Sequence, residues 1–209
     1  FRSRKLVADP SDAAAINSLI SAGNLITTKA DDFQFKYSTT QSNPDSRHPV
    51  FADNYNTAAD VADYMSNAYM AEMVSQKGVT DVRANYYFYR QDDDVTDNDD
   101  NEIPCGNERR PGHYTLSEVF CYIGYNDITP AESTSNGYWG RDHGYDFGIP
   151  PDTNIRTAWG LYPVGGKFDD ESFTAIADRN IGTKGAGIEP IMLSSFVDFM
   201  LAETALTNP

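Results

Sequence analysis

Cysteine, long apolar runs and basic residues are all scarce in this sequence, and each shortage excludes a class of protein. The two cysteines, Cys105 and Cys121, are too few for a disulfide framework or a four-cysteine zinc site, although they suffice for one bridge in an oxidising compartment. No run of about eighteen apolar residues occurs, so the sequence predicts no membrane-spanning helix. No basic segment with an apolar core resembles a signal peptide either.

The charge balance restricts the partners. Lys and Arg number 16 against 31 Asp and Glu, which gives a formal net charge of -15 over 209 residues. Such a field repels phosphate backbones and anionic membrane surfaces, and it therefore argues against nucleic-acid binding. The charge does not exclude neutral polar ligands. A hydrophobic content of 40% is enough to bury a core.

The chain begins at Phe1, and its first methionine is Met65. We therefore expect a piece of a longer protein, from which any export signal or lipid anchor is missing.

Helical periodicity appears near both ends and once between them. Asp9 as N-cap, Pro10 at the first helical position and Gly23 as stop predict the second helix of an αα-hairpin. Residues 57–78 and 189–209 carry apolar stripes at helical spacing. A single domain, 1–209, is expected, with scaffold helices at 1–31 and 189–209, strand and loop at 32–56, a helix at 57–78 and a loop-rich insertion at 79–188.

The insertion holds thirteen of the 15 glycines, so long helices cannot run through it. Alternating or β-favouring residues predict short strands at 32–37, 84–90 and 118–123. Because the stretch is also rich in aromatic residues, we expect it to carry function rather than disorder.

An acidic run at 91–102 suggests a calcium loop. Oxygen ligands fall at positions 1, 3, 5 and 12 of the pattern, on Asp97, Asp99, Asn101 and Glu108. Glu102, however, stands where the sharp turn requires glycine. A solvated acidic loop is therefore favoured over specific calcium binding.

Residues 137–152 combine aromatic rings, charges and glycines more densely than any other part of the chain. Rings stack on the C–H faces of sugars, and Arg, Asp and His side chains bond to hydroxyls, so this composition suits a carbohydrate site. The alternative is structural, with Trp139 and Phe147 anchoring a glycine-hinged loop to the core. The predicted ligand-binding residues are Tyr138, Trp139, Arg141, Asp142, Tyr145, Asp146 and Trp159.

Catalytic patterns are weak. Asp142, Asp146 and Asp152 could supply a glycosidase pair, but loop spacing does not fix the separation of the carboxylates. The three histidines, at 48, 113 and 143, lack zinc-ligand spacing. No nucleophile elbow, phosphate-binding loop or dinucleotide fingerprint occurs. We therefore expect no enzyme.

Four phrases, taken in order, resemble SusD/RagB-like outer-membrane proteins. They are NPDSRHP at 43–49, YWGRDHG at 138–144, RTAWGLYPVGGKFD at 156–169 and PIMLSSFVDF at 190–199. The resemblance covers nearly all of the chain, as the middle segment of such a protein. It implies a mainly α fold of tetratricopeptide-like helix pairs with a loop-rich, weakly β insertion, incomplete at both ends.

The resemblance also implies a cell-surface lipoprotein of the outer membrane that captures oligosaccharides for a SusC-like TonB-dependent transporter. The lipid anchor itself is absent from this chain, and the location favours a disulfide between Cys105 and Cys121. We therefore predict a protein that binds a glycan or similar oligomeric nutrient. The alternatives are an interaction module that caps the transporter and, less favoured, a glycoside hydrolase.

Overall fold

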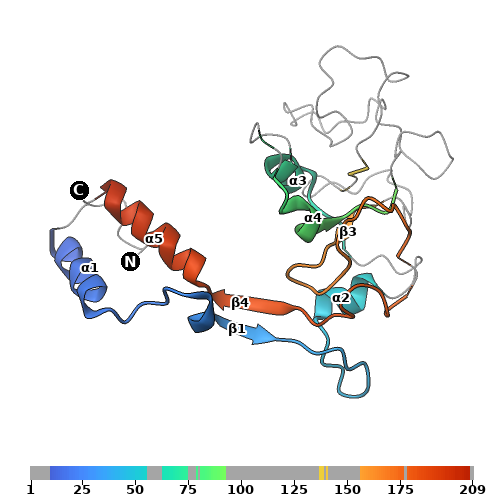
Figure 1. Cartoon of the computed structure of the whole chain (residues 1–209), viewed down its shortest axis with the longest axis horizontal. Helices are drawn as coiled ribbons and strands as arrows, with labels where there is room; N and C mark the ends of the chain where they lie inside the picture. The colour runs from blue at the N-terminus through green and yellow to red at the C-terminus, as the bar shows by residue number, and fades with distance from the viewer. Residues whose placement is uncertain are drawn as a thin grey trace, which may run out of the picture. The chain divides into compact units, whose positions relative to one another are not determined.

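The structure is a computed structural model that describes residues 10–55, 63–74, 79, 81–92, 137–138, 140, 156–176 and 178–207. The chain divides into two compact units (Figure 1). Unit 1 comprises Phe1–Phe35 and Glu189–Pro209, and unit 2 comprises Lys36–Ile188. No helix in the described part of the chain is long and apolar enough to cross a membrane.

Unit 1 confirms two of the predicted elements. Helix α1 spans Pro10–Ala22, and Gly23 ends it with a φ of +69°, a conformation that costs glycine little. The preceding helix of the expected hairpin lies outside the described residues. After a 3₁₀ turn at Lys29–Asp31, strand β1 covers Phe33–Lys36, as the alternation of aromatic residues predicts.

The predicted helix at 189–209 begins later than expected. Strand β4 occupies Ile188–Met192 and pairs with β1, and helix α5 then spans Ser194–Thr207. Pro190 is compatible with a strand here because a two-stranded sheet has only edges, where a missing N–H is tolerated. The Asp32 carboxylate accepts a hydrogen bond of 2.7 Å from the Ser194 backbone N–H at the start of α5.

The expected tetratricopeptide-like scaffold is wrong for the described residues. They are 35% helical and 14% strand, in five short helices and two small antiparallel sheets, and they show no helical repeat. Stacked repeats need consecutive helix pairs that bury faces against each other. In unit 2 the described helices are short instead: α2 and α4 contain only six and four residues.

The helices of unit 2 differ from the sequence prediction in position. Helix α2, Pro49–Asn54, was not expected; the His48 side chain accepts a hydrogen bond from the Val50 backbone N–H at its start. Helix α3 spans Asn67–Val74 and therefore begins ten residues after the expected start at 57. The strand expected at 84–90 is half right, because helix α4, Ala84–Tyr87, precedes strand β2, Phe88–Tyr89.

Strand β2 divides two hydrophobic clusters. It pairs antiparallel with β3, Ala158–Trp159, in the register Phe88 with Trp159 and Tyr89 with Ala158. Successive side chains of a strand point to opposite faces. Phe88 accordingly packs with Met65, Met70, Ala84 and Tyr138, whereas Tyr89 packs with Phe51, Tyr55, Ala158, Val164 and Ile176.

A buried arginine ties α2 to the segment before β3. Arg156 Nη1 donates to Asn54 Oδ1 and to the Asp63 carbonyl, at 3.2 and 3.1 Å, while Nη2 donates to the Asn54 carbonyl at 3.2 Å. Because its side chain is fully buried, these bonds compensate for the lost hydration of the guanidinium. Arg156 is therefore part of the framework and not of an exposed site.

Candidate functional site

The candidate site is an exposed aromatic surface on α4 and the loop that runs beside it. The loop after β3 hydrogen-bonds to α4 through Gly160 N–H to Tyr87 O, Tyr162 N–H to Tyr86 O and Asp169 N–H to Asn85 O, at 2.8, 2.8 and 2.9 Å. Gly160 makes this approach possible, because a Cβ there would collide with the backbone of Tyr86, Tyr87 and Phe88. Segments far apart in the sequence thus share one surface.

Two ring pairs join α4 to this loop. The rings of Tyr86 and Phe168 meet edge to face with centroids 4.8 Å apart, and those of Tyr87 and Tyr162 do so at 5.2 Å. Tyr86 is 46% exposed and Phe168 38%, so both keep ring area open to solvent. Such pairs prefer offset or edge-to-face geometry, which holds the rings without hiding their faces.

Helix α3 adds a third exposed ring. Tyr69 is 43% exposed, and its ring lies 5.5 Å from that of buried Phe88, edge to face. Partial burial raises the pKa of Tyr69, and the neighbouring Tyr87 adds to that rise. We call Tyr69, Tyr86, Tyr87, Tyr162 and Phe168 the aromatic surface.

A charged side chain stands beside these phenols. The Asp81 carboxylate accepts hydrogen bonds from Arg83 Nε at 2.9 Å, Arg83 Nη2 at 2.7 Å and the Arg83 backbone N–H at 3.0 Å. The hydrogen bond to Asp81 raises the pKa of Arg83, to which Tyr87 and Tyr69 also contribute. The surface therefore combines rings with a fixed guanidinium.

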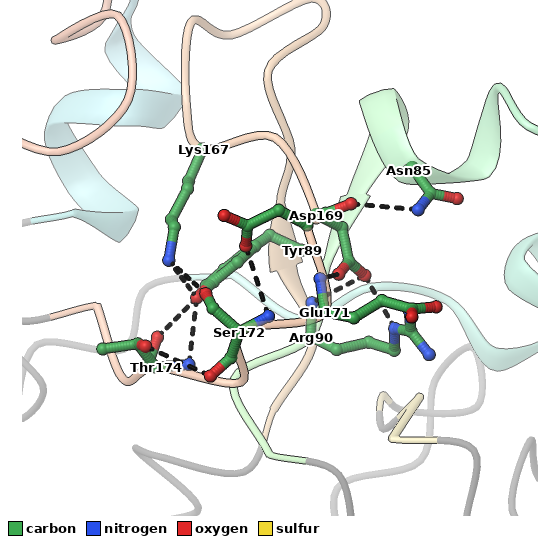
Figure 2. A network of polar contacts seen from close by, with 9 residues as sticks. Asn85, Tyr89, Arg90, Lys167, Asp169, Glu171, Ser172 and Thr174 are labelled. Carbon is green, nitrogen blue, oxygen red and sulfur yellow. Dashed lines mark hydrogen bonds and ion pairs between the residues drawn. The ribbon is translucent and has the colours of Figure 1, made fainter.

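A network of polar contacts holds the Phe168 loop in place (Figure 2). Asp169, fully buried, accepts a hydrogen bond of 2.6 Å from Arg90 Nε, and Glu171 lies 3.3 Å from Arg90 Nη2. Asn85 Nδ2 donates to the Asp169 carbonyl at 2.9 Å. Burial alone would lower the pKa of Arg90, but the hydrogen bond with Asp169 raises it above its usual value.

The second half of the network surrounds the Tyr89 hydroxyl. Lys167 Nζ donates to Tyr89 Oη at 2.7 Å and to Ser172 Oγ at 2.8 Å, and Tyr89 Oη donates to the Thr174 carbonyl at 2.7 Å (Figure 2). Lys167 and Asp169, the neighbours of Phe168 in the sequence, are therefore both held by side-chain hydrogen bonds. The Phe168 ring is carried by a loop that is fixed on both sides of it.

Strain in the same loop shows how firmly it is held. Glu171 and Phe173 adopt φ values of +60° and +48°, which non-glycine residues rarely do. Arg90 stabilises this conformation, because its guanidinium lies 5.1 Å from the centroid of the Phe173 ring and 4.9 Å from that of Tyr138.

Of the predicted ligand-binding residues, only Tyr138 and Trp159 lie in the described part of the chain. Tyr138 is 4% exposed within the Phe88 cluster, and burial raises its pKa to about 12. Trp159 is partly buried and packs against both clusters, with no acceptor for its indole N–H among described residues. Neither ring is an exposed platform in the described part of the chain. The structural alternative concerned Trp139 and Phe147, which lie outside the described residues.

The remaining predicted ligand-binding residues, Trp139, Arg141, Asp142, Tyr145 and Asp146, lie outside the described residues, and their role stays a prediction. The same holds for Asp97, Asp99, Asn101 and Glu108 as calcium ligands, and for Cys105 and Cys121 as a disulfide. Within the part of the chain that the structure describes, no group of three or more potential metal ligands occurs.

Sequence reasoning missed the aromatic surface itself. Tyr86 and Tyr87 stand inside the segment expected to be a strand, and Phe168 stands in one of the phrases quoted above without a ligand role. The available signal was the density of aromatic residues at 86–89, where four rings in succession exceed what one buried strand face can hold.

Comparison of the chain with protein-family models, characterised proteins and solved structures finds no match.

Proposed function

We propose that this chain is a binding protein that captures a glycan or a similar oligomeric nutrient and catalyses no reaction. The observation that supports this most directly is the exposed, edge-to-face pair of Tyr86 and Phe168. Arg83 lies one helical turn before Tyr86, whose backbone N–H donates to the Arg83 carbonyl at 2.9 Å. Flat rings of this kind stack on the C–H faces of sugar rings, while a guanidinium donates hydrogen bonds to hydroxyls.

Rigidity favours such a role. The Phe168 loop is fixed by the buried Arg90–Asp169 ion pair and by the Tyr89 hydroxyl, so little conformational entropy remains to be lost when a ligand binds. A preformed aromatic surface therefore binds a hydroxyl-rich molecule with few charges at a small cost in conformational entropy.

Charge supports a neutral ligand. A net charge of -15 disfavours nucleic acids and anionic lipid surfaces as partners, and it leaves uncharged glycans unaffected.

The cellular setting in this proposal rests on the resemblance of the phrases at 43–49, 138–144, 156–169 and 190–199. It comprises the outer surface of the outer membrane, a lipid anchor outside this chain and transfer of the ligand to a SusC-like TonB-dependent transporter. The helix-repeat scaffold of that resemblance forms no part of the proposal.

Isothermal titration with neutral gluco-, manno- and xylo-oligosaccharides tests the proposal. We expect binding by the unmodified chain and weaker binding after Tyr86→Ala or Phe168→Ala. Phe35→Ala is the matched control, because Phe35 is an exposed ring in unit 1. Absence of binding to every oligosaccharide, or an equal loss with Phe35→Ala, would refute it.

A second candidate function is the interaction module that caps the transporter. It is favoured by exposed apolar side chains of unit 1, which include Phe33, Phe35, Ile191, Phe199 and Leu206. Exposed apolar side chains that form one contiguous patch are typical of surfaces that contact another protein. Phe199→Ser should then weaken co-purification with a SusC-like transporter and leave oligosaccharide binding unchanged.

A further inference from the structure

The described part of the chain contains the same charged motif twice. The arginine is buried in one copy and exposed in the other. In each copy an Asp accepts three hydrogen bonds from the Arg two residues later: from its Nε, its Nη2 and its backbone N–H. The three distances are 3.0, 2.6 and 3.0 Å at Asp45–Arg47, and 2.9, 2.7 and 3.0 Å at Asp81–Arg83. We call this motif the Asp-x-Arg clip.

Burial distinguishes the two clips. The Arg47 side chain is 1% exposed and its Asp45 partner 39%, so the first clip holds a guanidinium inside unit 2, over the Phe51 ring. The Arg83 side chain is 65% exposed and its Asp81 partner 7%. The second clip therefore uses a nearly buried carboxylate to hold a guanidinium out in solvent.

The exposed Arg83 side chain, held by Asp81, is preorganised for a ligand. Free arginine side chains lose rotamer freedom when they bind, but Asp81 has already fixed both the backbone and the guanidinium of Arg83. Of five guanidinium N–H groups, two donate to Asp81, and the remaining three have no acceptor among the described residues. Arg83 also adjoins the aromatic surface, because its carbonyl accepts hydrogen bonds from the Tyr86 and Tyr87 backbone N–H groups at 2.9 and 3.1 Å.

The charges around Arg83 indicate which ligand fits. Asp81 neutralises the guanidinium locally, and the chain as a whole is strongly acidic, so an anionic ligand gains little net attraction. Uncharged hydroxyl oxygens, by contrast, accept hydrogen bonds from an already neutralised guanidinium without an electrostatic penalty.

We propose that Arg83 is a specificity-determining residue of the aromatic surface, which donates hydrogen bonds to the hydroxyls of a neutral glycan, and that Asp81 is its positioning residue. This inference rests on the proposed function. It adds to that function a selection against acidic glycans, such as those built from uronic acids.

Titrations with a neutral oligosaccharide that binds the unmodified chain, and with an oligogalacturonate, test the inference. Arg83→Ala should weaken neutral binding roughly tenfold, the effect of one or two hydrogen bonds from a charged donor. Arg83→Lys keeps the charge but loses the fork and should not restore the affinity. Asp81→Asn should weaken binding less than Arg83→Ala.

The matched control is Asp45→Asn, the same substitution in the buried-arginine clip, which should leave neutral binding unchanged in folded protein. Preference for the neutral ligand, insensitivity of its affinity to salt, and loss with both Arg83 variants support the inference. Unchanged affinity in both Arg83 variants, with loss in Phe168→Ala, overturns the inference and leaves the proposed function intact. Preference for the oligogalacturonate also overturns it, and no binding at all overturns both proposals.

Discussion

The ring of Phe168 meets the ring of Tyr86 at an interplanar angle of 66°, with 4.8 Å between the centroids, and each ring keeps more than a third of its surface in solvent. This pair connects α4 to a loop that the buried ion pair of Arg90 and Asp169 holds in place. The stability of that loop and the exposure of its ring are therefore separate properties, and they can be tested by different substitutions.

Removal of the Phe168 ring should affect binding more than folding. Phe168→Ala deletes an exposed side chain, so we expect a change in unfolding free energy of about 1 kcal/mol or less. Loss of one stacking partner should weaken glycan binding by about 1 to 2 kcal/mol, or roughly five- to thirtyfold. Chemical denaturation and calorimetric titration measure the two effects, and a large loss of stability without loss of affinity would contradict the assignment.

Loss of the buried Asp169 carboxylate should affect folding more than binding. Asp169→Asn removes the buried acidic partner of the Arg90 guanidinium and leaves the exposed Glu171 as its acidic partner among the described residues, so we expect a destabilisation of about 3 kcal/mol. Asp170→Asn, one residue later on an exposed carboxylate, is the control and should change stability far less than Asp169→Asn. Equal midpoints of urea denaturation for the two variants would argue against a structural ion pair.

The close approach of the loop to α4 depends on Gly160. Gly160→Ala forces a Cβ into the backbone of Tyr86, Tyr87 and Phe88, so we expect a destabilisation above 3 kcal/mol or displacement of the loop. Gly23→Ala is a useful comparison, because no atom lies within 4 Å of a Cβ there and its cost, about 1 kcal/mol, comes from the positive φ. Thermal unfolding of both variants would reveal the difference; a Gly160→Ala protein as stable as the unmodified chain would show that the loop does not pack this way.

The first Asp-x-Arg clip predicts acid sensitivity. The side-chain hydrogen bond from Arg47 lowers the pKa of Asp45 from 3.8 to about 2. Because the folded pKa is depressed, the stabilisation is fully present above pH 4 and is lost as the pH falls through 2. Asp45→Asn should remove this part of the acid dependence. Unfolding free energies of the two proteins should differ at pH 5 and converge near pH 2; a constant difference across that range would count against the clip.

Local signals in the sequence predicted several elements correctly. Pro10 and Gly23 bracket α1, and the alternation of Phe33 and Phe35 marks β1, because these cues act within a few residues. The helix expected from 189 was placed too early, since periodicity alone cannot show that strand β4 replaces its first turn. Residues 57–62 lie outside the described residues, and the described helix that follows begins at Asn67. At 84–87 the pattern suited a strand, yet Asp81 initiates a helical turn through its carbonyl bond to the Ala84 N–H.

Long-range relationships account for what the sequence could not predict. The aromatic surface depends on backbone bonds between α4 and a loop more than seventy residues later, and no spacing rule connects Tyr86 with Phe168. The tetratricopeptide-like scaffold was inferred from a resemblance and not from such contacts. The described residues instead form five short helices and two small antiparallel sheets, β1 with β4 and β2 with β3.

The two Asp-x-Arg clips should also diverge differently over evolutionary time. Substitution of Arg47 would empty a space inside unit 2, whereas Asp45 at the rim tolerates exchange more readily. At the other clip the sheltered residue is Asp81, so Arg83 is the position at which relatives can acquire a new ligand preference while they retain the fold. Purifying selection would thus act on the arginine of the first clip and on the aspartate of the second.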